Sequence, residues 1–482
     1  MTAGRTYDAV VIGAGPGGYV AAIRLAQLGK RTALVEREAL GGTCLNWGCI
    51  PSKALLAAAN LVDELMRAAD RGLVGDLRIE VERLRAFKEG VVRKLVAGVG
   101  TLEKGNGVEV IRGVARLAGP TEVDVELEPG GERLHLSAPA IVVATGAKAI
   151  EVPGFAVDGV DVWGAREALA LAEVPRRLAV IGGGIVGVEL GTAYAKLGAQ
   201  VTILEAQPAI LGACDPEAVR LVQRAFRQRG VAVKVSARAR GLERGPGGLA
   251  LRVEGQGGLE TLEVDKVLVA VGFRPSAEGL GLERLGVRFD ERGFVAVDER
   301  LRSSVPSIHA IGDLAGPPLL AHKASREGER VAEAIAGSPV GRRPKVIPSA
   351  VFCDPELAQV GLLEEAARAA GVDVVTGKFA FGALGRAVAM GREEGFVRVI
   401  AERGSRRIVG ASMAGPDASD LVAEAALAIE LGARLEDVAE TVHAHPTLAE
   451  AFMEACKVAL GRAVHVLPRP VGTGRGGEGA GS

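Results

Sequence analysis

The sequence predicts an α/β protein with two similar βαβ units and a C-terminal α+β domain. Two short apolar runs, at residues 9–12 and 178–181, each lead into a glycine-rich turn. After each turn come a helical pattern and a second apolar run that ends at a glutamate. From about residue 344 this pattern is absent, and short apolar strands mix with helices. A chain of 482 residues suits several domains rather than one core.

The first unit begins with the strand at residues 9–12, whose continuous apolar run is typical of a buried parallel strand. In the turn that follows, Gly13 permits a tight bend, Gly15 lets a pyrophosphate approach the backbone, and Gly18 allows close helix–strand packing. Glu36 ends the second strand and is placed to accept a hydrogen bond from a ribose hydroxyl.

The second unit repeats this arrangement at Gly182, Gly184 and Gly187, with Glu205 at the end of its second strand. The first glycine precedes the terminal acid by 23 residues in both units (13 to 36 and 182 to 205). The repeat predicts two Rossmann-like dinucleotide-binding domains. The alternative is two such folds of which one holds no nucleotide.

Three further apolar strands end in residues that suit a ligand site. The strand at 140–144 ends in Thr145 and Gly146, the strand at 266–271 ends at Gly272, and the strand at 308–311 leads to Asp313. Ligands of doubly wound sheets lie at the carboxyl ends of strands, so Asp313 is a candidate for a cofactor's polyol or phosphate edge. A plain turn aspartate is the alternative.

Two cysteines, Cys44 and Cys49, lie in the segment 41–53, and Pro51 with a helical pattern follows them. Proline is tolerated in the first turn of a helix, so both sulfurs are expected at or just inside a helix N-terminus. The helix dipole there favours thiolate over thiol. The pattern therefore predicts a reactive dithiol–disulfide pair, and the alternative is two buried, unpaired cysteines.

A second candidate site lies at residues 441–450, immediately before a helical pattern. Thr447 and Glu450 have the spacing of a capping box, but that structural interpretation does not account for His445. Dithiol chemistry needs a base near neutral pH, and a histidine oriented by a carboxylate is the usual solution. A metal site is disfavoured because no third and fourth ligand occur at a suitable spacing.

The C-terminal region from about residue 344 predicts an antiparallel sheet with helices. Strands are expected at 350–352, 396–400 and 408–411, and helices at 421–431, 435–441 and 448–459. The tail at 468–482, rich in Gly, Pro and Arg, is expected to be disordered.

Composition excludes several classes of function. A net charge of −1 gives no general attraction to nucleic acid or to an anionic membrane surface. We found no 18-residue uncharged apolar run, so no membrane insertion is expected. Five cysteines in 482 residues are not a secreted disulfide framework, and the N-terminus has no signal-peptide pattern. We expect a cytoplasmic location.

From Tyr7 to about Ala459 the chain resembles the class I pyridine nucleotide–disulfide oxidoreductases, most closely their dihydrolipoamide dehydrogenase branch. The motifs that carry the resemblance are Gly13–Gly18 with Glu36, Gly41–Lys53, Ala144–Gly146, Gly182–Gly187 with Glu205, Gly312-Asp313, Ala321–Ala324 and His443–Glu450. It implies an FAD domain (1–150), an NAD domain (151–275), a central domain completing the FAD site (276–345) and an interface domain (346–467).

The resemblance also implies a homodimer in which His445, held by Glu450, acts on the partner's Cys44 and the partner's Cys49. Cys44 would be the sulfur that substrate attacks and Cys49 the one nearer the flavin. Lys53, paired with Glu189, would place charge near the flavin, and the peptide bond before Pro446 would be cis. Further cofactor contacts are expected from Thr43, Thr145, Gly146, Gly272, Asp313 and Ala321.

The implied reaction is oxidation of dihydrolipoamide by NAD⁺ through FAD and the Cys44–Cys49 disulfide. The substrate would be carried by the lipoyl domain of an acyltransferase or by an H-protein, in a 2-oxo acid dehydrogenase or glycine-cleavage complex. Glu205 favours NAD over NADP, because it would repel a 2′-phosphate and residues 206–214 contain no Lys or Arg.

Two alternatives remain: a glutathione- or mycothiol-type reductase of the same family, and a non-catalytic subunit of a complex. Mercuric reductase and high-molecular-weight thioredoxin reductase are disfavoured because the C-terminus has no cysteine pair. Trp47 stands at a variable position of the family pattern, and Cys353 departs from it without a functional explanation.

Overall fold

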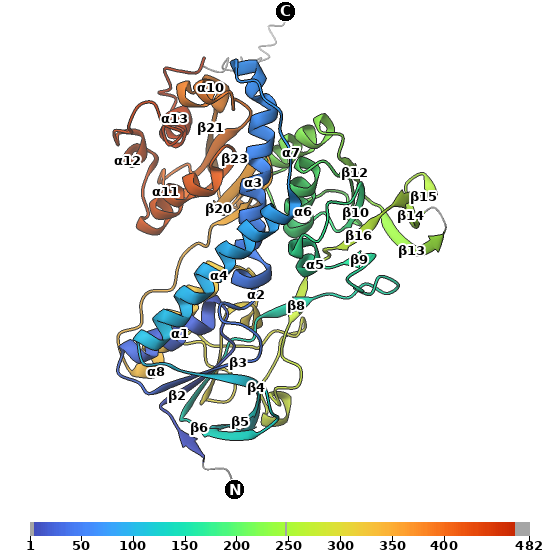
Figure 1. The fold of residues 1–482 in the computed structure, drawn as a ribbon. Helices are drawn as coiled ribbons and strands as arrows, with labels where there is room; N and C mark the ends of the chain where they lie inside the picture. Colours follow the sequence, from blue (N-terminus) through green and yellow to red (C-terminus); the bar gives the residue numbers. More distant parts are fainter. Residues whose placement is uncertain (1–3, 246–247, 468–482) are drawn as a thin grey trace, which may run out of the picture. The chain divides into compact units, whose positions relative to one another are not determined.

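The computed structural model describes residues 4–245 and 248–467 (Figure 1). The chain divides into two compact units. One consists of Met1–Gly212 with Phe226–Arg343, and the other of Ala213–Ala225 with Pro344–Ser482. The predicted disordered tail at 468–482 lies outside the described residues.

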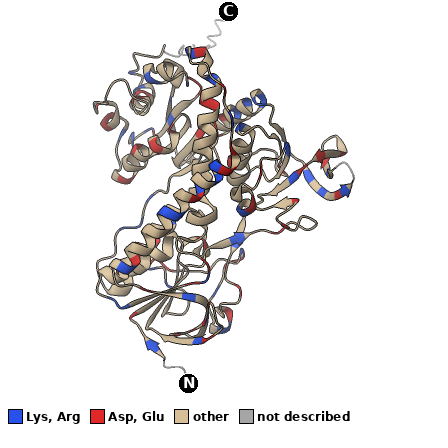
Figure 2. Cartoon of the chain, viewed as in Figure 1, with Lys and Arg blue, Asp and Glu red and all other residues tan. Residues whose placement is uncertain are grey.

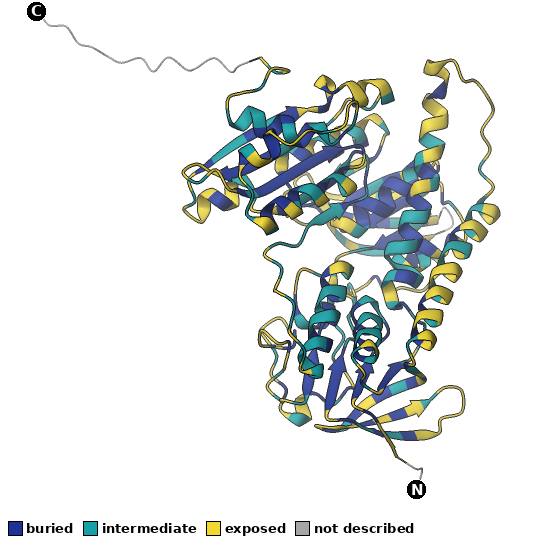
Figure 3. Cartoon of the chain, turned by 90° about the vertical axis from the view of Figure 1, so that its left-hand side faces the viewer, coloured by how far each residue is buried: buried dark blue, intermediate teal, exposed yellow. Residues whose placement is uncertain are grey.

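The first unit contains an eight-stranded sheet in the order β1-β6-β5-β4-β3-β2-β7-β18. Its strands are β1 (Arg5–Thr6), β2 (Ala9–Ile12), β3 (Thr32–Glu36), β4 (Glu109–Gly119), β5 (Glu122–Leu127), β6 (Arg133–Ser137), β7 (Ala140–Val143) and β18 (Ile308–Ala310). The run from β4 through β3, β2 and β7 to β18 is parallel, and its central strands are buried (Figure 3). The distant strand β18 therefore brings Asp313 to the same sheet edge as Gly13.

The first unit also contains helices and short 3₁₀ turns. They are α1 (Pro16–Gln27), α2 (Gly42–Trp47), α3 (Cys49–Arg67), α4 (Val81–Gly105) and α8 (Ala321–Ala336), with the 3₁₀ turns η1 (Ala68–Arg71), η2 (Glu283–Leu285) and η3 (Gly312–Ala315). Helices α1 and α8 pack closely where a Cβ on Gly328 would lie 2.5 Å from the Gly17 carbonyl oxygen. Acidic and basic residues both occur along α4 (Figure 2).

A second sheet, five-stranded and wholly parallel, has the order β12-β11-β10-β16-β9. Its strands are β9 (Val162–Trp163), β10 (Arg177–Ile181), β11 (Gln200–Leu204), β12 (Ala232–Lys234) and β16 (Lys266–Val269), accompanied by α5 (Ala165–Ala170) and α6 (Ile185–Lys196). This is the predicted second Rossmann-like domain. Helix α7 (Pro216–Gln228) follows β11 in the chain, and most of it belongs to the second unit. The pattern did not predict the antiparallel sheet of β13 (Arg238–Gly245), β14 (Gly248–Gly255) and β15 (Gly258–Val264). A two-stranded ribbon joins β8 (Ala147–Ala149) to β17 (Phe273–Pro275).

The second unit is the expected α+β domain with an antiparallel sheet, in the order β19-β20-β23-β22-β21. Its elements are β19 (Ser349–Val351), β20 (Glu356–Gly361), α9 (Glu364–Ala369), β21 (Val374–Ala380), η4 (Phe381–Ala383), α10 (Gly385–Met390), β22 (Phe396–Glu402), β23 (Ile408–Gly415), α11 (Ala418–Leu431), α12 (Leu435–Ala439) and α13 (Glu450–Ala459). Phe379, Phe381 and Phe452 are fully buried in its core. Within 4–245 and 248–467 no helix is both long enough and apolar enough to cross a membrane.

Candidate active site

The first glycine turn has the geometry of a phosphate-binding turn. Gly13 has φ +97°, and a Cβ there would lie 2.6 Å from the Ala144 carbonyl oxygen. A Cβ on Gly18 would collide with the Gly13 carbonyl, whereas one on Gly15 would meet nothing within 4 Å. Gly13 and Gly18 are thus required by the fold. Gly15 leaves open the space that a pyrophosphate needs at the N-terminus of α1.

The second turn repeats this division of roles. Gly182 has φ +113° and approaches the Ala270 carbonyl, and a Cβ on Gly187 would collide with the Gly182 carbonyl. A Cβ on Gly184 would again meet nothing within 4 Å. Both turns therefore fit a dinucleotide, FAD at the first and NAD at the second being the expected pair.

The two strand-end glutamates make the same contacts. Glu36 accepts from the backbone N–H groups of Ala14 and Glu38, each at 2.7 Å. Glu205 accepts from those of Gly183 and Gln207, also at 2.7 Å. Each carboxylate is thus fixed beside its glycine turn, at the position from which the sequence predicts a contact to ribose.

The other expected cofactor contacts, apart from Ala321, lie at or near the ends of strands. Thr145 follows β7 and donates its hydroxyl to the Ser276 carbonyl at 2.7 Å. Asp313 lies in η3 after β18, where burial raises the pKa of its carboxyl and Lys323 opposes that rise. Gly146 and Gly272 have φ of +69° and +117°. Ala321 is the first residue of α8.

The two cysteines lie in the first turns of two different helices. Cys44 is the third residue of α2, and Cys49 begins α3, where the sequence suggested a single helix near Pro51. The backbone of Gly48, at φ −138° and ψ −113°, separates the helices. Gly41 N–H donates to the Ala14 carbonyl at 2.8 Å, so α2 starts directly against the first phosphate turn.

The two thiols differ in their electrostatic environment. A hydrogen bond from Cys44 lowers the pKa of the Cys49 thiol to about 7; burial opposes this and the ammonium of Lys53 supports it. The same hydrogen bond and burial raise the pKa of the Cys44 thiol. In the reduced state Cys49 therefore ionises before Cys44, as dithiol exchange requires.

The expected pairing of Lys53 with Glu189 is present. Lys53 Nζ lies 2.8 Å from Glu189 Oε2, and the Glu189 side chain is 6% exposed. This pair joins α3, which carries Cys49, to α6, which begins at the second phosphate turn. It links the redox helix to the second nucleotide domain.

Sequence reasoning missed the partner of Trp47. The guanidinium of Arg166, in α5, lies 4.2 Å from the Trp47 ring centroid, within the range of a cation–π contact. Arg166 also forms an ion pair of 2.7 Å with Glu38. No sequence pattern indicated this contact, because the residues are far apart in the chain.

In the second unit, His445 and Glu450 lie together as expected. Their Nδ1 and Oε1 atoms are 2.9 Å apart, the His445 side chain is 77% exposed, and the peptide bond before Pro446 is cis. Burial raises the pKa of the Glu450 carboxyl, but hydrogen bonds from Thr447 N–H and His445 outweigh this and lower it overall. Glu450 thus stays ionised and orients the imidazole.

The expected capping role of Thr447 is only half present. Its N–H donates to Glu450 Oε2 at 2.8 Å, but its hydroxyl donates to the Ala444 carbonyl instead of capping α13. His443 forms a second histidine–carboxylate contact, 2.9 Å from Glu424. Among the described residues, no three His, Cys, Asp or Glu side chains form a group that could hold a metal ion.

Comparison with known proteins agrees with this geometry. Residues 7–328 match the model of the pyridine nucleotide–disulphide oxidoreductase family. Residues 347–456 match the model of that family's dimerisation domain. The chain accordingly has the domain through which these proteins form homodimers.

Several relatives match over nearly their full length. Dihydrolipoyl dehydrogenase from Thermus scotoductus is 47% identical over 96% of this chain and 100% of the relative. The enzyme of that name from Haloferax volcanii is 45% identical over 96% and 98%. The crystal structure of LpdA from Mycobacterium tuberculosis, 28% identical, superposes with a TM-score of 0.87 over 93% of this chain and 99% of the other. The chain belongs to the pyridine nucleotide–disulphide oxidoreductase family.

Proposed function

We propose that this protein is a dihydrolipoyl dehydrogenase, which oxidises protein-bound dihydrolipoamide with NAD⁺ by means of FAD and the Cys44–Cys49 disulfide. The observation that carries the proposal is the redox pair itself. Cys49 ionises near neutral pH, and its helix is joined to the second nucleotide domain through Lys53 and Glu189. The relatives of that name at 45–47% identity support the choice of substrate.

His445 serves as the base. Its Nδ1 is directed to Glu450, so Nε2 is the atom that takes a proton from a substrate thiol. The imidazole is 77% exposed on its own chain, which suits a group that acts on a second protomer. In the homodimer it serves the partner's Cys44 and the partner's Cys49.

Dithiol exchange then follows from the properties of the two sulfurs. The deprotonated substrate thiol attacks Cys44, the bond between Cys44 and Cys49 breaks, and Cys49 leaves with the electron pair as a thiolate. The second substrate thiol attacks the substrate sulfur bonded to Cys44, closes the lipoyl disulfide and releases Cys44, which takes the proton held by the imidazolium of His445. His445 in turn accepts the proton of the second substrate thiol, so the exchange ends with Cys44 as thiol, Cys49 as thiolate and His445 as imidazolium. Substrate loses two electrons and the protein disulfide gains them.

The cofactor sites are assigned to this chain's own residues. Gly13, Gly15, Gly18, Glu36 and Asp313 hold FAD, together with the contacts expected from Thr43, Lys53, Thr145, Gly146 and Ala321. Gly182, Gly184, Gly187, Glu205 and Gly272 hold NAD, and Glu189 contributes through its ion pair with Lys53. Bound FAD supplies two-electron transfer between the dithiol and the pyridine nucleotide.

The substrate carrier and the cellular location belong to the same proposal. The carrier is the lipoyl domain of an acyltransferase or an H-protein, and the location is the cytoplasm. Cys214 and Cys456 are free thiols, as expected in a reducing compartment.

The test is anaerobic titration of the holoenzyme with dihydrolipoamide. We expect a long-wavelength thiolate-to-flavin charge-transfer band in the wild type and its loss in Cys49→Ser. Cys44→Ser, which leaves the Cys49 thiolate in place, keeps the band but loses turnover. A flavin that dihydrolipoamide fails to reduce would contradict the proposal and favour the non-catalytic subunit.

A coenzyme comparison separates the remaining alternative. A glutathione- or mycothiol-type reductase would normally prefer NADPH. We expect NAD⁺ to be preferred over NADP⁺ by about tenfold or more, because Glu205 repels a 2′-phosphate and each charge pair costs about 1 to 4 kcal/mol. Equal rates with both coenzymes would count against this assignment.

A further inference from the structure

Helices α3 and α6 are joined by two polar contacts that share one register. Lys53 and Glu189 are the fifth residues of α3 and α6, and their charged atoms lie 2.8 Å apart. Asn60 and Lys196 are the twelfth residues, and Lys196 Nζ donates to Asn60 Oδ1 at 2.6 Å. Both contacts join residues 136 apart in sequence. The contacts are two turns apart, or about 10.5 Å, along each helix.

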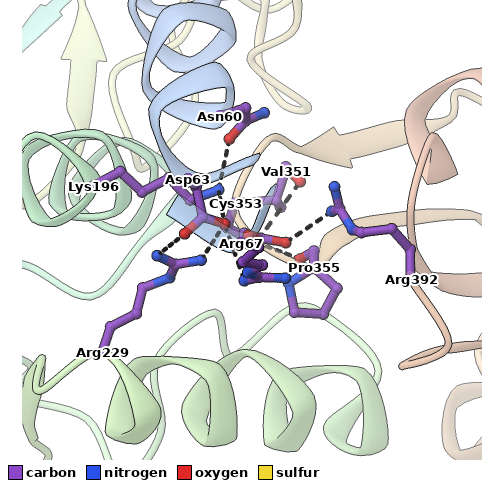
Figure 4. Close-up of polar contacts among 10 residues, drawn as sticks. Asn60, Asp63, Arg67, Lys196, Arg229, Val351, Cys353, Pro355 and Arg392 are labelled. Atoms are coloured by element: carbon purple, nitrogen blue, oxygen red, sulfur yellow. Dashed lines mark hydrogen bonds and ion pairs between the residues drawn. The ribbon is translucent and has the colours of Figure 1, made fainter. Parts of the chain in front are cut away.

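The second contact is the more buried of the two. The Lys196 side chain is 2% exposed, and its ammonium also lies 3.9 Å from Asp63, one turn further along α3. The Asp63 carboxylate in turn accepts hydrogen bonds from both terminal guanidinium nitrogens of Arg229, at N···O distances of 2.5 and 2.6 Å. It also forms an ion pair of 2.9 Å with Arg67 (Figure 4). These five residues, Asn60, Asp63, Arg67, Lys196 and Arg229, are termed the α3–α6 anchor.

A buried ammonium is costly unless it is partnered, so the anchor favours the alignment in which Lys196 keeps its hydrogen bond to Asn60. Sliding α6 by one turn, about 5.4 Å, would break that hydrogen bond and change the distance from Lys196 to Asp63. The same displacement would separate Glu189 from Lys53. The anchor therefore fixes a contact two turns away, at the end of α3 that carries Cys49.

We propose that Lys196 is a positioning residue, which aligns α6 with α3 so that Glu189 holds Lys53 beside Cys49. The proposal rests on the proposed function, since it concerns the same redox pair. Its chemical consequence is specific. Lys53 favours the thiolate of Cys49 and Glu189 disfavours it, so the alignment of the two helices sets how readily this sulfur ionises.

The experiment measures the ionisation of the dithiol rather than turnover. Reduced holoenzyme is alkylated with iodoacetamide across a range of pH, which gives the apparent pKa of the reactive pair. We expect Lys53→Met to raise this pKa by about 1 unit or more, because a close opposite charge shifts a pKa by about 1 to 3 units. Lys196→Met should raise it by about half as much, because Lys53 is then held less firmly.

Non-additivity is the decisive readout. Once Lys53 is absent, its position no longer matters and only the displacement of Glu189 can act on Cys49. Adding Lys196→Met to Lys53→Met should therefore change the thiol pKa by much less than Lys196→Met does alone. Asn60→Ala is the second, milder variant, which removes the acceptor of Lys196 but keeps Asp63 and Arg229. It should shift the pKa in the same direction as Lys196→Met.

Lys266→Met is the matched control. Lys266 is also a partly buried lysine of the second domain in an ion pair, 3.0 Å from Glu173, but its partner is not on α3. It should leave the thiol pKa unchanged. A Lys196→Met protein that melts earlier with an unaltered thiol pKa, or one that adds its full shift to that of Lys53→Met, would overturn the proposal. Because alkylation needs no lipoyl substrate, this result stands apart from the test of the enzymatic activity.

Discussion

At the scale of the residue, Glu103 in α4 is a buried acid that the proposed reaction does not use. Its side chain is fully buried, and neither carboxyl oxygen has a hydrogen-bond partner among the described residues. Burial raises the pKa of Glu103 to about 8 from its ordinary 4.5. The folded chain therefore holds a proton here that the unfolded chain releases.

The sign of the resulting pH dependence follows from linkage. Between about pH 4.5 and 8 the folded state binds more protons at Glu103 than the unfolded state, so the free energy of unfolding falls as pH rises. Glu103→Leu removes this decrease in the free energy of unfolding, because leucine carries no ionisable proton. We expect it to raise Tm by about 3 °C or more at pH 8, and by less at pH 5, in thermal melts.

Glu89→Leu on the same helix provides the control for Glu103. The Glu89 side chain is 48% exposed, so its loss should not alter the pH dependence of the melting temperature. Equal effects of Glu103→Leu at pH 5 and pH 8 would show that Glu103 ionises normally in the folded protein.

At the scale of the element, each βα turn contains two kinds of glycine. Some are required for the backbone to pack, and one leaves the space in which a nucleotide can bind. Gly18→Ala would drive a methyl group into the Gly13 carbonyl, so we expect an unstable protein that fails to accumulate. Gly15 has φ −68°, which alanine adopts without strain, and a Cβ there would meet nothing within 4 Å, so Gly15→Ala fits the fold. This variant should fold with a nearly normal apoprotein Tm but retain less FAD, measured by the absorbance ratio of flavin to protein.

The corresponding substitutions in the second turn, Gly184→Ala and Gly187→Ala, test the same distinction at the NAD site. Gly184→Ala should leave the FAD content unchanged and raise the KM for NAD⁺, because its Cβ also meets nothing within 4 Å. Gly187→Ala should destabilise the domain, as Gly18→Ala does. A Gly15→Ala protein with full FAD content would show that the pyrophosphate does not approach this turn.

Sequence reasoning worked well where spacing alone determines the contact. The distance from glycine turn to terminal acid predicted that Glu36 and Glu205 lie beside their turns, because a βαβ unit of fixed length brings strand ends together. Their contact to ribose stays a prediction. Sequence reasoning was less accurate at helix ends. The break at Gly48 and the hydroxyl of Thr447, which turns to Ala444, depend on local backbone geometry that the residue types do not dictate.

At the scale of the whole molecule, the proposed site requires two chains, and this can be tested by mixing subunits. Cys44→Ser and His445→Gln homodimers should each be inactive in dihydrolipoamide oxidation. In a mixed dimer, one of the two sites combines an intact disulfide with an intact histidine from the other chain. Random reassociation of equal amounts makes half the dimers mixed, so about 25% of wild-type activity should return.

The measurement is the lipoamide reaction rate after co-refolding or co-expression of the two variants. Inactive mixtures, with heterodimers verified by two affinity tags, would mean that His445 acts within its own chain. Flavin content of each parent variant confirms that both subunits fold.

Apart from the Lys53–Glu189 pair, long-range packing is the part of the molecule that the sequence did not predict. The partner of Trp47 in α5 and the contact between Asn60 and Lys196 join segments more than a hundred residues apart. The sequence did contain a pattern that matches the contact between Asn60 and Lys196. Asn60 lies seven positions after Lys53, and Lys196 lies seven positions after Glu189. This pattern becomes meaningful only when the two helices are known to lie side by side.

The twin carboxylates of Glu36 and Glu205 have a consequence for nucleotide capture. Each carboxylate accepts hydrogen bonds from two N–H groups of its own loop, so contacts within the chain hold the loop in the conformation that receives a nucleotide. The entropy lost on docking then falls mainly on the incoming molecule. Preorganised nucleotide-binding turns of this kind can release and rebind a nucleotide without refolding of the surrounding chain.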